Sequence, residues 1–126
     1  MKTSKPITLY LMRHGEIQDT SKLAGHTDFT LSNNGLSQMQ RSIEGKVISN
    51  CISSPLSRCH DFAQVFSQEN DLTLTVEPAI KECHFGDWDG VAFNELWQLP
   101  SPNIGDFWQK PTEVTPPNGE SFTQFK

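Results

Sequence analysis

The sequence predicts an α/β fold with a mostly parallel sheet, because strand-like and helix-like patterns alternate along it. Three short apolar stretches, residues 7–12, 47–52 and 72–76, have the length and composition of strands. Helical patterns over residues 32–44 and from residue 54 onward separate them. Since strands joined through helices lie parallel in right-handed crossovers, we expect a single α/β domain over residues 1–126.

The first strand and the first helix are predicted from apolar periodicity. Ile7–Met12 is almost continuously apolar, so we expect it in the middle of the sheet, covered on both faces. Ser32 is suited to cap a helix that runs to about Glu44 and ends at Gly45. Its expected buried face carries Leu36, Met39 and Ile43.

The pattern then repeats. Val47–Ile52 is the second predicted strand, and Ser54 with Pro55 predicts a helix start, since proline in the first helical position loses no hydrogen bond. Leu72–Val76 alternates apolar residues with threonine and is expected nearer the sheet edge. The expected buried face of the second helix carries Leu56, Cys59, Phe62, Ala63 and Phe66.

Only short helices are expected in the last third of the chain. Phe93–Leu99 has the pattern of a short helix, and Gly119-Glu120-Ser121 is suited to begin another. Residues 100–119, between them, are expected to be mostly irregular.

The charge and the cysteine content of the chain argue against several classes of partner and against a metal site. The net charge of −5 argues against a nucleic-acid partner, which requires a basic face. No apolar run reaches membrane-spanning length and residues 1–6 do not resemble a signal peptide, so we expect no membrane partner and a cytoplasmic protein. Cys51, Cys59 and Cys83 are odd in number and form no Cys-x-x-Cys pair. We therefore predict reduced thiols, no metal site and no cofactor.

Chemistry is expected where the first predicted strand ends, at the sequence Arg13-His14-Gly15-Glu16. The carboxyl edge of a parallel sheet is where ligands of open α/β folds bind. Arg13 offers a permanent cation with a planar donor fork, and Gly15 allows close approach of a ligand. A neutral imidazole beside such a cation suits phosphoryl transfer, with His14 as the nucleophile if its second nitrogen is held as a donor. Glu16 is expected to anchor the loop.

The Arg13–Glu16 sequence resembles the opening motif of the histidine phosphatase superfamily, the phosphoglycerate mutase-like enzymes. Four later segments are similar to further motifs of that family in the same order: residues 25–31 with Gly35, 53–58, 82–90 and 117–122. The resemblance implies a three-layer α/β/α fold of the phosphoglycerate mutase-like type. It also implies phosphomonoester hydrolysis through a phosphohistidine, with a small phosphorylated substrate.

On this resemblance, His14 and Glu82 are the predicted catalytic residues, and Arg13 and Arg58 the predicted phosphate-binding residues. Glu82 would protonate the leaving alkoxide and later deprotonate the hydrolytic water, which requires a carboxyl that keeps its proton near neutral pH. We expect burial beside aromatic side chains to favour that state. Without the motifs, Arg58 would be interpreted as a surface helix residue near a carboxylate and Glu82 as a solvated loop carboxylate.

Gly25, His26 and His84 are the predicted substrate-side contacts, although both histidines fit exposed loop positions equally well. His60 falls on the second predicted helix and is expected to be structural. One aromatic set is expected to form mainly core and lid, or to bound a pocket for a flat substrate. Its members are Phe85, Trp88, Phe93, Trp97, Phe107 and Trp108.

The family's second His-Gly, which follows a later strand, has no counterpart in this sequence. His26, His60 and His84 are each followed by a residue other than glycine. We therefore expect a domain truncated before that strand, with little activity alone. Within the superfamily the motifs are most similar to the α-ribazole-5′-phosphate phosphatases of cobalamin biosynthesis. A phosphoglycerate mutase, a broad-specificity phosphatase and an inactive phosphate-binding module are the alternatives.

Overall fold

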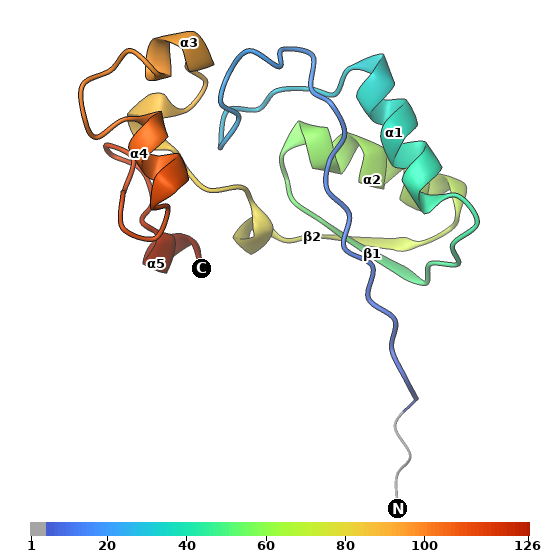
Figure 1. Ribbon diagram of the computed structural model, residues 1–126. Coiled ribbons are helices and arrows are strands. Elements are labelled where there is room, and N and C mark those ends of the chain that lie inside the picture. The colour runs from blue at the N-terminus through green and yellow to red at the C-terminus, as the bar shows by residue number, and fades with distance from the viewer. Residues whose placement is uncertain (1–4) are drawn as a thin grey trace, which may run out of the picture.

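The computed structural model describes residues 5–126 (Figure 1). It has a two-stranded parallel sheet in one half, with the short helices of the last third of the chain in the other half. Strand β1 (Asn50–Ser53) pairs in parallel with β2 (Thr73–Val76), with Cys51 opposite Leu74. Helix α2 (Ser57–Glu69) joins the two strands and contacts both. The predicted strand–helix–strand crossover is therefore confirmed. Strand β1 begins at Asn50, three residues later than the predicted strand over residues 47–52.

The prediction of a strand over Ile7–Met12 is wrong for this structure. The segment has no regular structure, and Ile7 and Leu11 are 92% and 89% exposed instead of buried. A cavity of about 240 Å³ lies between this segment and β1. The backbones are therefore not joined by the ladder of hydrogen bonds that defines a strand. The prediction that residues 1–6 form no signal peptide falls partly on residues 1–4, which lie outside the described residues.

The helices α1 and α2 lie beside each other in the half of the molecule that holds the sheet (Figure 1). Helix α1 (Asn33–Ile43) begins as predicted, since the Ser32 side chain accepts the Gly35 N–H at 3.0 Å. Helix α2 begins at Ser57, later than predicted. Its Ser57 N–H and hydroxyl donate to the Asp28 carboxylate at 2.6 and 2.9 Å, so a distant loop caps it.

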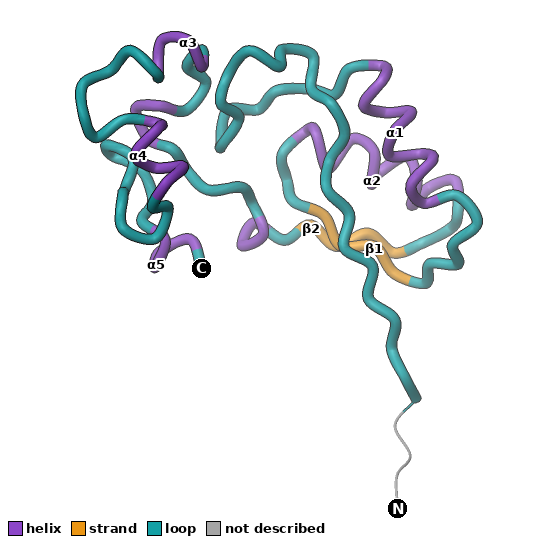
Figure 2. The backbone as a smooth tube through the Cα atoms, in the orientation of Figure 1, coloured by secondary structure: helices purple, strands orange, loops and turns teal. Residues whose placement is uncertain are grey.

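The last third of the chain holds three short helices joined by long loops (Figure 2). Helix α3 (Phe93–Leu96) and helix α5 (Phe122–Phe125) confirm two predicted helices. Helix α4 (Ile104–Gln109) lies in the stretch predicted to be irregular, and that prediction is wrong there. A capping box explains α4, because the Asn103 and Asp106 side chains each accept the other's backbone N–H. None of the helices within residues 5–126 is long and apolar enough to cross a membrane.

The main buried cluster lies away from the sheet, between loop 82–90 and helices α3 and α4. Trp88, in this cluster, is 2% exposed, and Leu96 and Ile104 are fully buried. Leu23 joins this cluster from the loop after residue 13, and its N–H and C=O bond to Val91 and Gly90 at 3.0 and 2.8 Å. These bonds hold the N-terminal loop against loop 82–90 and so bring the sequence motifs together.

Candidate active site

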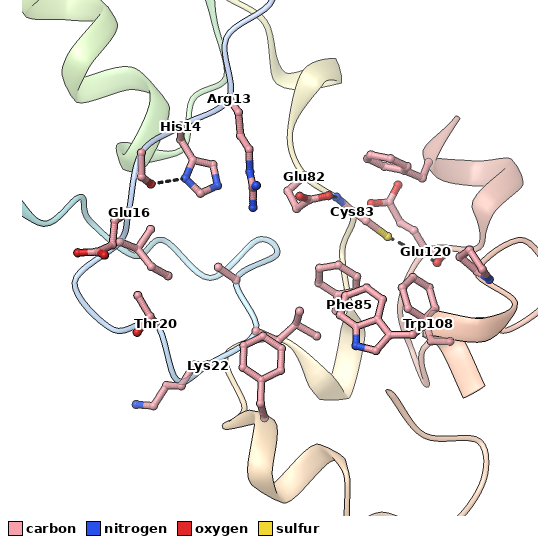
Figure 3. A pocket seen from close by; sticks show the side chains of 18 of the residues that line it. Arg13, His14, Glu16, Thr20, Lys22, Glu82, Cys83, Phe85, Trp108 and Glu120 are labelled. Carbon is pink, nitrogen blue, oxygen red and sulfur yellow. Dashed lines mark hydrogen bonds between the residues drawn. The ribbon is translucent and has the colours of Figure 1, made fainter. Parts of the chain in front are cut away.

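A cavity of about 760 Å³ opens where the N-terminal loop, loop 82–85 and helices α4 and α5 meet. Figure 3 shows Arg13, His14 and Glu82 at one end of it, pointing into the same space. The structure thus brings together three of the residues that the sequence singles out, from segments about seventy positions apart. Sequence proximity explains only the Arg13 and His14 pair.

The imidazole of His14 is held in one tautomer. Its Nδ1 lies 2.7 Å from the carbonyl oxygen of Gly15. A carbonyl oxygen only accepts, so Nδ1 carries a proton in this bond, and in the neutral imidazole the lone pair is then on Nε2. The backbone behind the ring is tightly placed, because a Cβ on Gly15 would collide with the backbone of Gly35 in α1. The neutral imidazole of His14 therefore has Nε2 as its oriented lone-pair nitrogen.

Glu16 anchors the loop that carries His14 and Arg13. Its N–H donates to the Gln38 side chain at 2.9 Å, and its carbonyl and carboxylate accept from the Ser32 N–H and hydroxyl, each at 2.9 Å. These bonds join the loop to the first turns of α1. Arg13, three residues before Glu16, has an exposed side chain on the cavity wall.

Glu82 lies on the cavity wall but is exposed, so the expectation that it is buried among aromatic residues is wrong. Its Oε1 accepts the N–H of the next residue, Cys83, at 2.7 Å, which keeps the carboxylate at the loop surface. Phe85 and Trp88 turn into the core instead.

Burial, reinforced by the nearby carboxylates of Glu120 and Glu82, raises the pKa of the Cys83 thiol to about 11.

Arg58 lies under the loop of residues 24–27 and does not line the cavity. It is 1% exposed, so its interpretation as a surface residue is wrong. The guanidinium donates to the Gly25 and Thr27 carbonyls at 2.6 and 3.0 Å. Within the described part of the chain its Nε–H has no hydrogen-bond partner. Arg58 thus braces the loop, and phosphate binding by it stays a prediction.

Asp89 also holds this loop, through contacts that the sequence did not predict. Its carboxylate accepts the His26 and Thr27 N–H groups at 2.7 Å each, the Phe85 N–H at 3.2 Å and the Thr27 hydroxyl. Burial alone would raise the Asp89 pKa, but these hydrogen bonds outweigh it and hold the pKa below its usual range. Gly25 permits this packing, because a Cβ there would collide with the carboxylate.

The His26 and His84 rings contact each other at a tilt, with centroids 4.5 Å apart and an interplanar angle of 45°. His84 Nδ1 accepts the Gly86 N–H at 2.9 Å, so that nitrogen is unprotonated and its 3.9 Å approach to Asp89 is no ion pair. His26 Nε2 lies 3.7 Å from the Glu120 carboxylate. Neither histidine lines the cavity, nor does Gly25, and their contact with substrate stays a prediction. Within residues 5–126 no group of three acidic, histidine or cysteine side chains is arranged to hold a metal ion.

The other end of the cavity is aromatic. Of the aromatic set singled out in the sequence, Trp88 belongs to the core and Trp97 is exposed elsewhere. Lys22 and Glu120 also line the cavity, and only Glu120 lies in a motif that the sequence had indicated. The aromatic wall consists of Phe85, Phe93, Phe107, Trp108, Phe122 and Phe125.

Known proteins are similar to this chain in sequence and in fold. A bifunctional protein of Mycobacterium tuberculosis is 31% identical over 123 residues, which cover 93% of this chain and 34% of that protein. The adenosylcobalamin/alpha-ribazole phosphatase of Escherichia coli is 28% identical over 122 residues, 93% of this chain and 60% of its own. The crystal structure of a mycobacterial glucosyl-3-phosphoglycerate phosphatase superposes with a TM-score of 0.76 at 27% identity, covering 89% of this chain and 55% of that one.

These matches confirm the predicted phosphoglycerate mutase-like fold, of which this chain covers a part. The chain spans between 34% and 60% of the length of the two relatives named above. The model of the histidine phosphatase superfamily (branch 1) matches residues 9–126, which include each segment singled out as a motif. The chain therefore belongs to the histidine phosphatase superfamily.

Proposed function

We propose that the protein hydrolyses phosphomonoesters through a phosphohistidine formed on His14. The observation that carries this proposal is the 2.7 Å bond from His14 Nδ1 to the Gly15 carbonyl, which places the lone pair of the neutral imidazole on Nε2, beside Arg13. In-line attack on phosphorus needs such a lone pair together with a cation for the phosphoryl oxygens. Superfamily membership supports the same chemistry.

In the proposed reaction, the His14 Nε2–phosphorus bond forms as the ester P–O bond breaks. Glu82 gives its proton to the leaving alkoxide and then takes a proton from the water that attacks the phosphohistidine. Inorganic phosphate leaves and His14 regains its lone pair. Arg13 neutralises the phosphoryl oxygens. The motifs assign the same task to Arg58, whose guanidinium lies under the loop of residues 24–27 in this structure.

The substrate that we propose is α-ribazole-5′-phosphate, which would place the protein in cobalamin biosynthesis in the cytoplasm. The relative named alpha-ribazole phosphatase and the motif spelling support this choice. Glucosyl-3-phosphoglycerate is the alternative, supported by the structural relative of that name. We further propose that the complete domain includes a later strand with a second histidine, as the superfamily resemblance implies.

The test is phosphohistidine trapping in the full-length protein. Brief incubation with a radiolabelled phosphomonoester is expected to yield an acid-labile, base-stable label that His14→Ala abolishes. His60→Ala is the matched control, because His60 lies half-buried on α2 away from the cavity. Label that survives His14→Ala would remove His14 from its proposed role.

Glu82→Gln tests the second catalytic role. An alkyl phosphate needs a protonated leaving group, whereas p-nitrophenolate leaves without one. We therefore expect Glu82→Gln to slow hydrolysis of an alkyl phosphate far more than phosphohistidine formation from p-nitrophenyl phosphate. Equal losses with both esters would contradict the proton-donor role.

A further inference from the structure

The two ends of the cavity differ in chemistry. The end near His14 carries Arg13, Glu82 and polar backbone, whereas the far end is a wall of aromatic rings from loop 82–85, α3, α4 and α5. Figure 3 shows the Trp108 indole reaching from its helix into the space below Glu82 and Cys83. A phosphomonoester with its phosphoryl group at His14 would extend its leaving group toward this wall.

The aromatic wall is rigid behind Trp108. The Phe107 ring meets Phe85 and Trp88 edge to face, with centroids 5.9 and 6.2 Å apart and interplanar angles of 89° and 83°. The Phe107 and Trp108 ring centroids are 5.5 Å apart. Phe107 is therefore fixed by the core, while Trp108 remains 52% exposed and keeps ring surface free for a ligand. Pre-placed rings of this kind stack on planar groups with little loss of side-chain entropy.

Charged groups near this wall are already engaged. The Lys22 ammonium lies 3.2 Å from the Asp19 carboxylate. The Glu120 carboxylate accepts the His84 N–H at 2.7 Å. Among the described residues that line the cavity, Arg13 and Lys22 are the basic ones, and Arg13 lies at the phosphoryl end. A second anionic group on the leaving group would therefore meet an acidic side chain without an unpaired cation beside it.

We propose that the cavity selects phosphomonoesters whose leaving group is neutral and carries a planar aromatic ring system, which stacks on Trp108. This inference rests on the proposed function for the position of the phosphoryl group, and it names the substrate class of the same site. Trp108 is then a specificity-determining residue. It takes no part in bond breaking.

Binding of non-hydrolysable probes to the full-length protein tests the inference without relying on catalysis. The probes are 2-naphthylmethylphosphonate, 2,3-dihydroxypropylphosphonate and 2-carboxyethylphosphonate, titrated by calorimetry. We expect the naphthyl probe to bind about tenfold tighter than the dihydroxypropyl probe, because stacking and burial of an aromatic ring change an affinity by roughly that factor. The carboxylate probe is expected to bind weakest. Equal affinities, or tightest binding of the carboxylate, would overturn the proposal.

Variants separate stacking from general damage. Trp108→Leu is expected to remove about tenfold of the naphthyl affinity and leave the dihydroxypropyl affinity unchanged, whereas Trp108→Phe keeps most of the preference. Trp97→Leu is the matched control, since Trp97 is 55% exposed but does not line the cavity. A naphthyl preference that survives Trp108→Leu in folded protein would refute the stacking role. If the leucine variant unfolds, Trp108→Gln is titrated in its place, and a naphthyl preference that survives it refutes the role in the same way.

Hydrolysis of the matching phosphate esters distinguishes this inference from the proposed function. Both esters leave as unactivated alkoxides, so a difference in kcat/KM reports binding of the leaving group. Naphthyl preference in binding with no phosphate release would refute the proposed function alone. Phosphate release with equal kcat/KM for both esters would refute the aromatic selectivity alone.

Discussion

Asp89→Asn is expected to destabilise the protein by about 3 kcal/mol. The Asp89 side chain is 7% exposed and accepts hydrogen bonds from His26, Thr27 and Phe85. An amide keeps one accepting oxygen but turns its NH₂ toward donors, so roughly two charge-assisted bonds of about 1.5–3 kcal/mol each are lost, less what relaxation recovers. For a chain of 126 residues this corresponds to a fall in Tm of roughly 10 °C.

Urea unfolding at several pH values measures this loss and its origin. The Asp89 pKa is lowered on folding, so its contribution is fully present above the ordinary aspartate pKa of about 3.9 and is lost as the pH falls through the lower folded value. The difference between wild type and Asp89→Asn should be constant from about pH 5 to 7 and shrink below about pH 4. Asp61→Asn, on the exposed side of α2, is the control. A difference below about 0.5 kcal/mol, or one unchanged at low pH, would refute the reasoning.

Three further outcomes are expected. Arg58→Lys loses the planar fork that bonds the loop carbonyls, so urea unfolding should show a loss of about 2–3 kcal/mol, and a loss near zero would contradict the bracing role. Because the pKa of Cys83 is about 11, its alkylation by iodoacetamide should be slow at pH 8 and rise with pH to beyond pH 10, without a plateau near 8.5. If the domain continues past Lys126 as proposed, the 126-residue chain should hydrolyse phosphomonoesters far more slowly than a chain extended through the following codons, and equal rates would contradict that proposal.

Local sequence patterns predicted the elements that local forces decide. Ser32 identified the start of α1, because a side-chain cap acts within three residues. Apolar alternation identified β2, and the helix between the strands gave their parallel pairing. Helix α4 was missed although Asn103 and Asp106 carry the capping pattern, because the prolines and glycines around it favour loops. The start of α2 was misplaced because its cap, Asp28, comes from another part of the chain.

Segment 7–12 shows the limit of apolar patterning most clearly. Its composition indicates a buried strand, but a strand forms only where a neighbouring backbone supplies its hydrogen bonds. Among the described residues β1 pairs with β2 alone, and Ile7, Leu9 and Leu11 of segment 7–12 remain exposed. Strand pairing depends on two segments, so the sequence of one segment alone does not predict it.

The sequence by itself determined the chemical groups of this protein: a histidine beside an arginine, a distant glutamate, and the motif order that identifies the family. The tertiary structure alone decided which nitrogen of His14 bonds the backbone, that Glu82 is exposed, and that Arg58 and Asp89 hold the same loop through its carbonyl and N–H groups. It also decided that the aromatic rings form a cavity wall. The physical reason is that residue type fixes what a side chain can donate, accept or bury, whereas its partners come from segments that only folding brings within hydrogen-bonding distance.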